Sequence, residues 1–293
     1  MIRCLILMVA LGIGGAAHGD ERRVQTKDAG DLELIQALDT LIPQWLRSEE
    51  IPGLNIALAR RGVLVWEGAY GYADAKTRRP MTTDTVFRSG SIAKPYASVA
   101  IMQLVERGAL KLDDPIDTYL PFKVVNPFGG PPITIRHLLT HRSGLGGDSA
   151  ASYLCERADT IRPLAELLAL AYRYQYAQAP VGTGPHRFHQ MWTQPVGAQY
   201  QYSNLGVATL GVIVERANPE RLSYSDYVQK HIMDRLGMQY AQMPPAQIRE
   251  LIRADIWERL STGYQVLGGA WVPTAQVCFG EFPCGGSLAT PAD

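Results

Sequence analysis

The chain has 293 residues, 46% of them hydrophobic and 19% charged, which is ordinary for a globular protein with a large core. Its 28 Lys and Arg residues balance its 28 Asp and Glu residues, so the formal net charge is +0. This balance, and the lack of any basic run in the sequence, argue against nucleic acid or a polybasic membrane contact as the main partner.

The first residues have the pattern of a secretory signal peptide. A positive start precedes a short apolar run, and Ala17-His18-Gly19 is an acceptable cleavage site. The apolar run is short for a membrane span, although an uncleaved N-terminal anchor is the alternative. We therefore predict a signal peptide at residues 1–19, a mature domain at residues 20–293 with no integral membrane span, and a periplasmic or secreted location.

The first part of the mature chain predicts two helices around a hairpin. Apolar residues recur at helical spacing over residues 31–47, which indicates an amphipathic helix. Residues 54–70 predict a β-hairpin with a tight turn at Arg61 and Gly62, and a loop follows it. Residues 96–105 predict a second helix that is apolar almost all round and therefore buried.

Helices dominate the rest of the chain. Strand-like alternation is found only near its end, at residues 260–272, and the Pro- and Gly-rich start of residues 179–196 indicates an exposed excursion. The remaining apolar periodicity predicts helices at residues 134–140, 161–176, 206–217 and 224–236.

Three cysteines remain in the predicted mature chain. Cys278 and Cys284 bracket a small loop and can pair in an oxidising compartment, but their spacing leaves two free thiols as an open alternative. Cys155 is expected to be a buried apolar residue.

A Ser-x-x-Lys pattern, Ser91 to Lys94, begins the helix predicted at residues 96–105. Residues three apart share a helix face, so the Lys94 amine reaches the Ser91 hydroxyl, which lies in the positive field of the helix N-terminus. A serine hydroxyl needs a base or a positive field to become a nucleophile. The pattern alone is common, and a capping serine with an accidental lysine is the alternative. Burying the charge of a lysine next to an apolar helix costs free energy. A lysine at this position therefore favours a catalytic role.

A second pattern, Tyr202-x-Asn204, lies in front of the helix predicted at residues 206–217. On an extended backbone the two side chains point to the same side. Acyl transfer by a serine needs a group that takes and returns its proton, and an amide that holds the substrate. A cation such as Lys94 favours the phenolate form of a nearby tyrosine, so the two patterns have a joint meaning.

These patterns resemble the serine β-lactamase and penicillin-binding-protein superfamily, in its branch of class C β-lactamases, D-peptidases and related esterases. Residues 51–53, 70–74, 137–145 and 285–290 match that branch too. The resemblance implies an α/β (α+β) two-lobed β-lactamase-like fold. An antiparallel sheet is flanked by helices, a helical lobe is inserted, and the site lies between the lobes. It implies no cofactor.

The resemblance also implies a role for each motif residue. Ser91 is the acylated nucleophile, and its N–H is half of the oxyanion hole. Lys94 supports its activation, Tyr202 is general base and then acid, and Asn204 holds the substrate amide and orients Lys94. The implied activity is hydrolysis of a small-molecule or peptide substrate, which is a β-lactam, a D-amino-acid peptide or an ester. The sequence leaves that choice and the oligomeric state open.

The family's third motif, a basic residue or His followed by Thr or Ser and then Gly, is not found in its expected place. Ser261-Thr262-Gly263 precedes the Gly-Gly-Ser-Leu segment, which is the wrong order. We therefore expect residues 20–293 to stop before this motif. The closing strands of the sheet would then be missing, and the hairpin at residues 54–70 would keep an unpaired edge.

Other functions are less well supported by the sequence. A non-catalytic penicillin-recognition-like protein that binds cell-wall peptides is the alternative, because the third motif is missing. No metal site is expected: His137 and His141 are four apart, but no Glu follows His137 as in a zinc hydrolase. His186 and His189, three apart, are the other spaced pair. The sequence also lacks the Gly-x-Ser-x-Gly pattern of an α/β-hydrolase.

Overall fold

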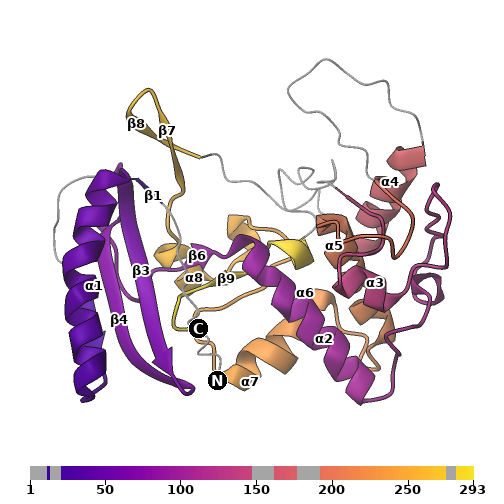
Figure 1. Cartoon of the computed structure of the whole chain (residues 1–293), viewed down its shortest axis with the longest axis horizontal. Helices are drawn as coiled ribbons and strands as arrows, with labels where there is room; N and C mark the ends of the chain where they lie inside the picture. The colour runs from indigo at the N-terminus through magenta and orange to yellow at the C-terminus, as the bar shows by residue number, and fades with distance from the viewer. Residues whose placement is uncertain (1–11, 14–20, 147–161, 177–191, 275–281) are drawn as a thin grey trace.

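The computed structural model of the chain describes residues 12–13, 21–146, 162–176, 192–274 and 282–293. These residues form a sheet with one covering helix and a larger group of helices, with short elements between them (Figure 1). No helix in the described ranges is long and apolar enough to cross a membrane.

The sheet is built on the predicted hairpin, which consists of β3 (Ile51–Arg60) and β4 (Val63–Asp74). Arg61 and Gly62 form its turn with φ angles of 53° and 79°. Positive φ at both central residues is what a two-residue turn of this hand requires, and Gly62 adopts it without strain. The hairpin prediction is therefore confirmed.

Short strands pair with both edges of this hairpin, although the expectation of an unpaired edge concerned residues 20–293, which lack one of these strands. The strand order is β1-β3-β4-β2, with β1 (Gly12–Ile13) on β3 and β2 (Glu21–Val24) on β4. β5 (Arg79–Pro80) adds to β4 within the stretch expected to be a loop. β1 lies inside the predicted signal segment, so in the predicted mature chain β2 covers an edge of the hairpin. The charged sequence of β2 gave no alternating pattern to identify it.

α1 (Ala29–Ser48) covers one face of the sheet, as the helical spacing predicts (Figure 1). Asp28 caps the helix by accepting a hydrogen bond from the Asp31 N–H at 3.0 Å. Ile35 and Ile42 on its inner face belong to one buried cluster with Trp66 of β4, which is fully buried. This cluster holds α1 on the sheet, and it is separate from the larger buried cluster formed by the other helices.

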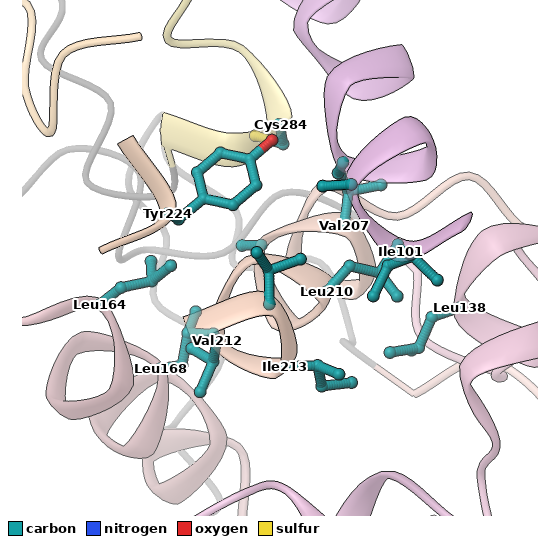
Figure 2. Packing of buried hydrophobic residues seen from close by; sticks show 14 of the residues in the cluster. Ile101, Leu138, Leu164, Leu168, Val207, Leu210, Val212, Ile213, Tyr224 and Cys284 are labelled. Atoms are coloured by element: carbon teal, nitrogen blue, oxygen red, sulfur yellow. The ribbon is translucent and has the colours of Figure 1, made fainter. Parts of the chain in front are cut away.

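The helical layer confirms the predicted helices and is centred on α5 (Asn204–Ala217), in which every residue from Leu205 to Val214 is buried. Figure 2 shows Leu210 and Ile213 of α5 among side chains of its neighbours. A π-helical turn interrupts the helix predicted at residues 224–236. The layer also contains α2 (Lys94–Glu106), α3 (Ile135–Leu139), α4 (Leu164–Tyr176), α6 (Tyr224–Val228), the π-turn η5 (Gln229–Met233) and α7 (Asp234–Leu236).

α2 buries only one of its faces. Ala97 and Ile101 are fully buried against the helical core, whereas Val99 and Met102 are 44% and 41% exposed. The expectation of a helix buried all round is wrong on this side. An apolar composition predicts that a helix is buried, but it does not show which of its faces pack against other segments.

Short elements join the two layers. β6 (Phe87–Arg88) pairs antiparallel with β9 (Leu288–Ala289), which brings the last described residues beside the start of α2 (Figure 1). The others are η1 (Gly90–Ala93), η2 (Ile116–Thr118), η6 (Arg249–Leu251), α8 (Ala254–Arg259) and η7 (Phe282–Cys284).

The strand-like alternation at residues 260–272 corresponds to a hairpin. It consists of β7 (Tyr264–Leu267) and β8 (Ala270–Pro273). Gly268 and Gly269, with φ angles of 59° and 76°, turn the chain back between them. The Gly-Gly turn thus divides the alternating pattern into two paired strands.

Candidate active site

Ser91 lies in the 3-10 turn η1, between the end of β6 and the first residue of α2. Gly90 begins this turn with a φ of 54°, a conformation that suits glycine. Ala93 and Ala97 behind the turn are fully buried and anchor it on the helical core. Ser91 itself is exposed, so a molecule in solution can reach it.

The Lys94 ammonium donates hydrogen bonds to three oxygens. Its Nζ lies 3.2 Å from Ser91 Oγ, 2.8 Å from Asn204 Oδ1 and 2.8 Å from the carbonyl oxygen of Cys284. A lysine ammonium has three N–H donors and no acceptor, so these contacts use all of them. Lys94 is therefore a fixed positive charge that ties the Ser91 turn to α5 and to η7.

Tyr202 and Asn204 stand on either side of the residue that caps α5. That residue, Ser203, has an extended backbone, and its Oγ accepts a hydrogen bond from the Gly206 N–H at 3.0 Å. The Tyr202 hydroxyl lies 2.6 Å from Ser91 Oγ. Both predicted side chains reach the same site, although Asn204 is already helical. The structure thus brings the four motif residues together.

The Tyr202 ring lies between charged and aromatic neighbours. Lys94 Nζ is 4.6 Å from its centroid, and the His141 ring is 4.9 Å away with its plane tilted by 30°. Tyr200 contacts the His141 ring edge-on, with 5.6 Å between centroids. Burial, and then the Lys94 charge, hold the pKa of His141 below its ordinary value. Sequence reasoning gave His141 no place here, although it lies in a segment that carried the resemblance.

His137 and His141 have separate partners in the structure. His137 Nδ1 accepts a hydrogen bond from the Thr134 N–H at 3.1 Å and completes a capping box at the start of α3. His141 Nδ1 accepts one from the Ser203 N–H at 3.2 Å. In the described parts of the chain, no three or more His, Cys, Asp or Glu residues gather in a way that could hold a metal ion. The other spaced histidines, His186 and His189, lie outside the described residues.

The segment around η7 and β9 contributes backbone contacts to the site, and sequence reasoning gave it no part in the chemistry. The Cys284 carbonyl accepts from Lys94, and the Ser89 N–H donates to the Ser287 carbonyl at 3.0 Å. The hydroxyls of Ser89 and Ser287 are also hydrogen-bonded to each other. Cys155 and Cys278 lie outside the described residues, so both alternatives for Cys278 and Cys284, a disulfide or two free thiols, stay open.

The Thr262-Gly263 pair, which the sequence places in the wrong order for the third motif, contacts the end of β4 instead. The Thr262 N–H donates to the Ala73 carbonyl at 2.9 Å, and its hydroxyl donates to Asp74 at 2.9 Å. Tyr264 donates to the same carboxylate at 3.0 Å. These bonds hold the start of β7 against the end of β4. Burial raises the pKa of Asp74, but the hydrogen bonds from Thr77, Thr262 and Tyr264 together outweigh it, so this pKa lies below its ordinary value.

Comparison with known proteins gives consistent results. A family model described as Beta-lactamase matches residues 34–293. The chain is 34% identical over 216 residues to the esterase EstB of Burkholderia gladioli, which covers 70% of this chain and 50% of the esterase. It is 28% identical over 204 residues to penicillin-binding protein 4* of Bacillus subtilis (strain 168), which covers 69% of this chain and 40% of that protein. The chain thus spans half or less of the length of these relatives.

A solved structure supports the same assignment. The octameric penicillin-binding protein homologue from Pyrococcus abyssi has a TM-score of 0.67 and 27% identity, covering 88% of this chain and 54% of that one. Because the family model spans most of the sequence and a solved relative shares the arrangement of sheet and helices, this chain belongs to the Beta-lactamase family and has its α/β fold.

Proposed function

We propose that this protein is a serine hydrolase that cleaves ester or amide bonds through an acyl-enzyme on Ser91. The observation that carries the proposal is the position of Ser91 Oγ, 2.6 Å from the Tyr202 hydroxyl and 3.2 Å from Lys94 Nζ. A nucleophile, a proton acceptor and a fixed positive charge within hydrogen-bond distance are what serine acyl transfer needs. Such a set has no evident use in a protein that only binds.

In the first step Tyr202 takes the Ser91 proton while Ser91 Oγ attacks the carbonyl carbon of the substrate. Tyr202 takes this proton as the phenolate, whose negative charge is stabilised by the Lys94 ammonium, 4.6 Å from the ring centroid. The transfer leaves Tyr202 neutral, and the negative charge passes to the oxygen of the substrate carbonyl. The tetrahedral intermediate then expels an alcohol or an amine, which leaves with the proton that Tyr202 returns. Water repeats the sequence on the acyl-enzyme and releases the carboxylic acid.

Asn204 and the Ser91 backbone have supporting roles in this scheme. Asn204 Oδ1 accepts from Lys94 at 2.8 Å, which fixes the orientation of its amide group, and we assign that amide to the substrate. The Ser91 N–H is assigned to the oxyanion that forms on the substrate carbonyl oxygen.

We take an activated ester as the first substrate to test, because the relative at 34% identity is named an esterase. β-Lactams and D-amino-acid peptides present the same reactive carbonyl and are the other substrates to test. We place the mature protein, residues 20–293, in the periplasm or outside the cell, on the strength of the predicted signal peptide.

Intact-protein mass spectrometry after mixing with a nitrophenyl ester or a β-lactam tests the proposal. We expect an adduct that forms and decays in the parent protein and is absent from Ser91→Ala. Ser98→Ala, one turn after Lys94 in α2, is the matched control and should be labelled like the parent. An adduct that persists in Ser91→Ala contradicts the proposal. A parent protein that binds cell-wall peptides but never acquires an adduct supports the non-catalytic alternative.

A further inference from the structure

His141 is the residue near Tyr202 that the proposed chemistry does not use. It follows α3 and has a φ of 53°, a left-handed conformation that residues other than glycine adopt rarely. This turn of the backbone brings both its carbonyl and its ring to the segment in front of α5.

Two hydrogen bonds from that segment end on His141, one from each chain neighbour of Tyr202. The Gln201 N–H donates to the His141 carbonyl at 2.7 Å, and the Ser203 N–H donates to His141 Nδ1 at 3.2 Å. The imidazole also packs on the Tyr202 ring at 4.9 Å. A single residue thus holds the backbone on both sides of Tyr202 as well as its ring, and the position of the Tyr202 hydroxyl depends on all three contacts.

The bond from Ser203 defines the protonation state of the ring. Because Nδ1 accepts a hydrogen bond, it carries no proton, so the imidazole is neutral with its proton on Nε2. Protonation would turn Nδ1 into a donor that faces the Ser203 N–H. It would also add a second positive charge near Lys94, since the Lys94 charge already opposes protonation of His141.

We propose that His141 is a positioning residue whose neutral imidazole keeps the Tyr202 hydroxyl against Ser91, and whose protonation releases it. The inference rests on the proposed function, because it assigns an acid limit to the same reaction. The titratable or charged groups around His141 are Lys94 on α2, Tyr200 and Tyr202 before α5, and His137 and Arg142 on its own segment.

The direction of the pH effect follows from these contacts. The fold disfavours the protonated ring, so its pKa lies below the ordinary value of a histidine. The bond from Ser203 is therefore intact at neutral pH and is lost as the pH falls through that lowered pKa. Stability follows the same sign, because the unfolded chain binds the proton more readily.

Two substitutions separate the hydrogen bond from the ionisation. Asn at position 141 keeps an acceptor oxygen near the place of Nδ1, tolerates positive φ and does not titrate. For His141→Asn we expect kcat/KM for a nitrophenyl ester within about tenfold of the parent, without the decline that the parent should show as the pH falls below the ordinary pKa of a histidine. His141→Leu keeps neither acceptor nor imidazole, and should lose about a hundred-fold in kcat with little change in KM.

His137→Asn is the matched control, because His137 is a second histidine of the same segment whose pKa is also lowered by burial. Its contacts cap α3 and do not reach Tyr202, so this variant should keep the acidic decline and most of its turnover. Two results would overturn the inference: a His141→Asn profile with the acidic decline of the parent, or parental kcat in His141→Leu.

A spectroscopic readout tests His141 apart from turnover. In ¹⁵N-histidine NMR spectra, His141 should show the Nε2–H tautomer, and the Ser203 amide shift should follow the titration of His141. If Ser91 were not labelled, the proposed function would be wrong, but these spectra would not change, so the two tests are independent. A proton on His141 Nδ1 at neutral pH, or a Ser203 amide that ignores the titration, would refute the positioning role itself.

Discussion

Replacing Tyr202 with Phe removes one oxygen from the site and leaves the ring contacts in place. The deleted hydroxyl lies 2.6 Å from Ser91 Oγ. The distances from the ring centroid, 4.6 Å to Lys94 Nζ and 4.9 Å to the His141 ring, do not depend on it. The substitution therefore separates proton transfer from packing.

The expected effects on rate and on stability differ widely. A positioned acid–base group contributes about a hundred- to ten-thousand-fold in rate, which is about 2.7–5.5 kcal/mol of barrier. A hydrogen bond contributes about 0.5–1.5 kcal/mol to stability, and the lower end applies at a residue as exposed as Tyr202. We expect kcat/KM to fall by at least about a hundred-fold, while the free energy of unfolding changes by less than about 1 kcal/mol.

Steady-state hydrolysis of a chromogenic ester and thermal unfolding measure the two quantities on the same samples. Tyr200→Phe is the matched control, because Tyr200 is 61% exposed and its ring contacts His141 rather than Ser91. It should keep the parental rate. If Tyr202→Phe also hydrolysed the ester at the parental rate, Tyr202 would not be the proton acceptor, and the hydrogen bond to Ser91 would have only a structural role.

Two further substitutions test the surroundings of the site. In Gly211→Ala the added methyl would lie 2.6 Å from Pro283, so the turn that holds the Lys94 acceptor must shift. We expect lower turnover and a loss of about 1–3 kcal/mol of stability by chemical denaturation, whereas Gly206→Ala, with no atom nearer than 3.4 Å, should lose neither. Burial raises the pKa of Glu215, so its ionisation costs stability as the pH rises. Glu215→Gln should therefore gain stability over the parent as the pH rises above the ordinary pKa of a glutamic acid, and equal pH profiles of unfolding would contradict this.

The local elements could be predicted from the sequence because each carries its own periodicity. The helix expected at residues 31–47 is α1 (Ala29–Ser48), and the helix expected at residues 206–217 is α5 (Asn204–Ala217). The two site patterns were recognisable for a related reason. Ser91 and Lys94 are one helical turn apart, so their contact follows from local geometry alone.

The contacts between distant segments could not be predicted in this way. The Cys284 carbonyl is a backbone atom that any residue type would supply, so no side chain marks it as an acceptor for Lys94. The pairing of β6 with β9 joins two strands of two residues each, too short for an alternating pattern. The spacing of His137 and His141 indicates only a shared helix face, whereas the contacts of His141 with residues 201–203 depend on how α3 meets α5.

The three oxygens that accept hydrogen bonds from Lys94 affect the order in which the protein folds during and after its synthesis. They belong to residues 91, 204 and 284, and the last is 190 residues away from Lys94. At about 5–20 residues per second, a ribosome adds it roughly ten to forty seconds after Lys94. Closing such long loops is slow compared with forming α2. A nascent or refolding chain therefore acquires its helices first, and reactivity of Ser91 towards a covalent probe is the last property to appear.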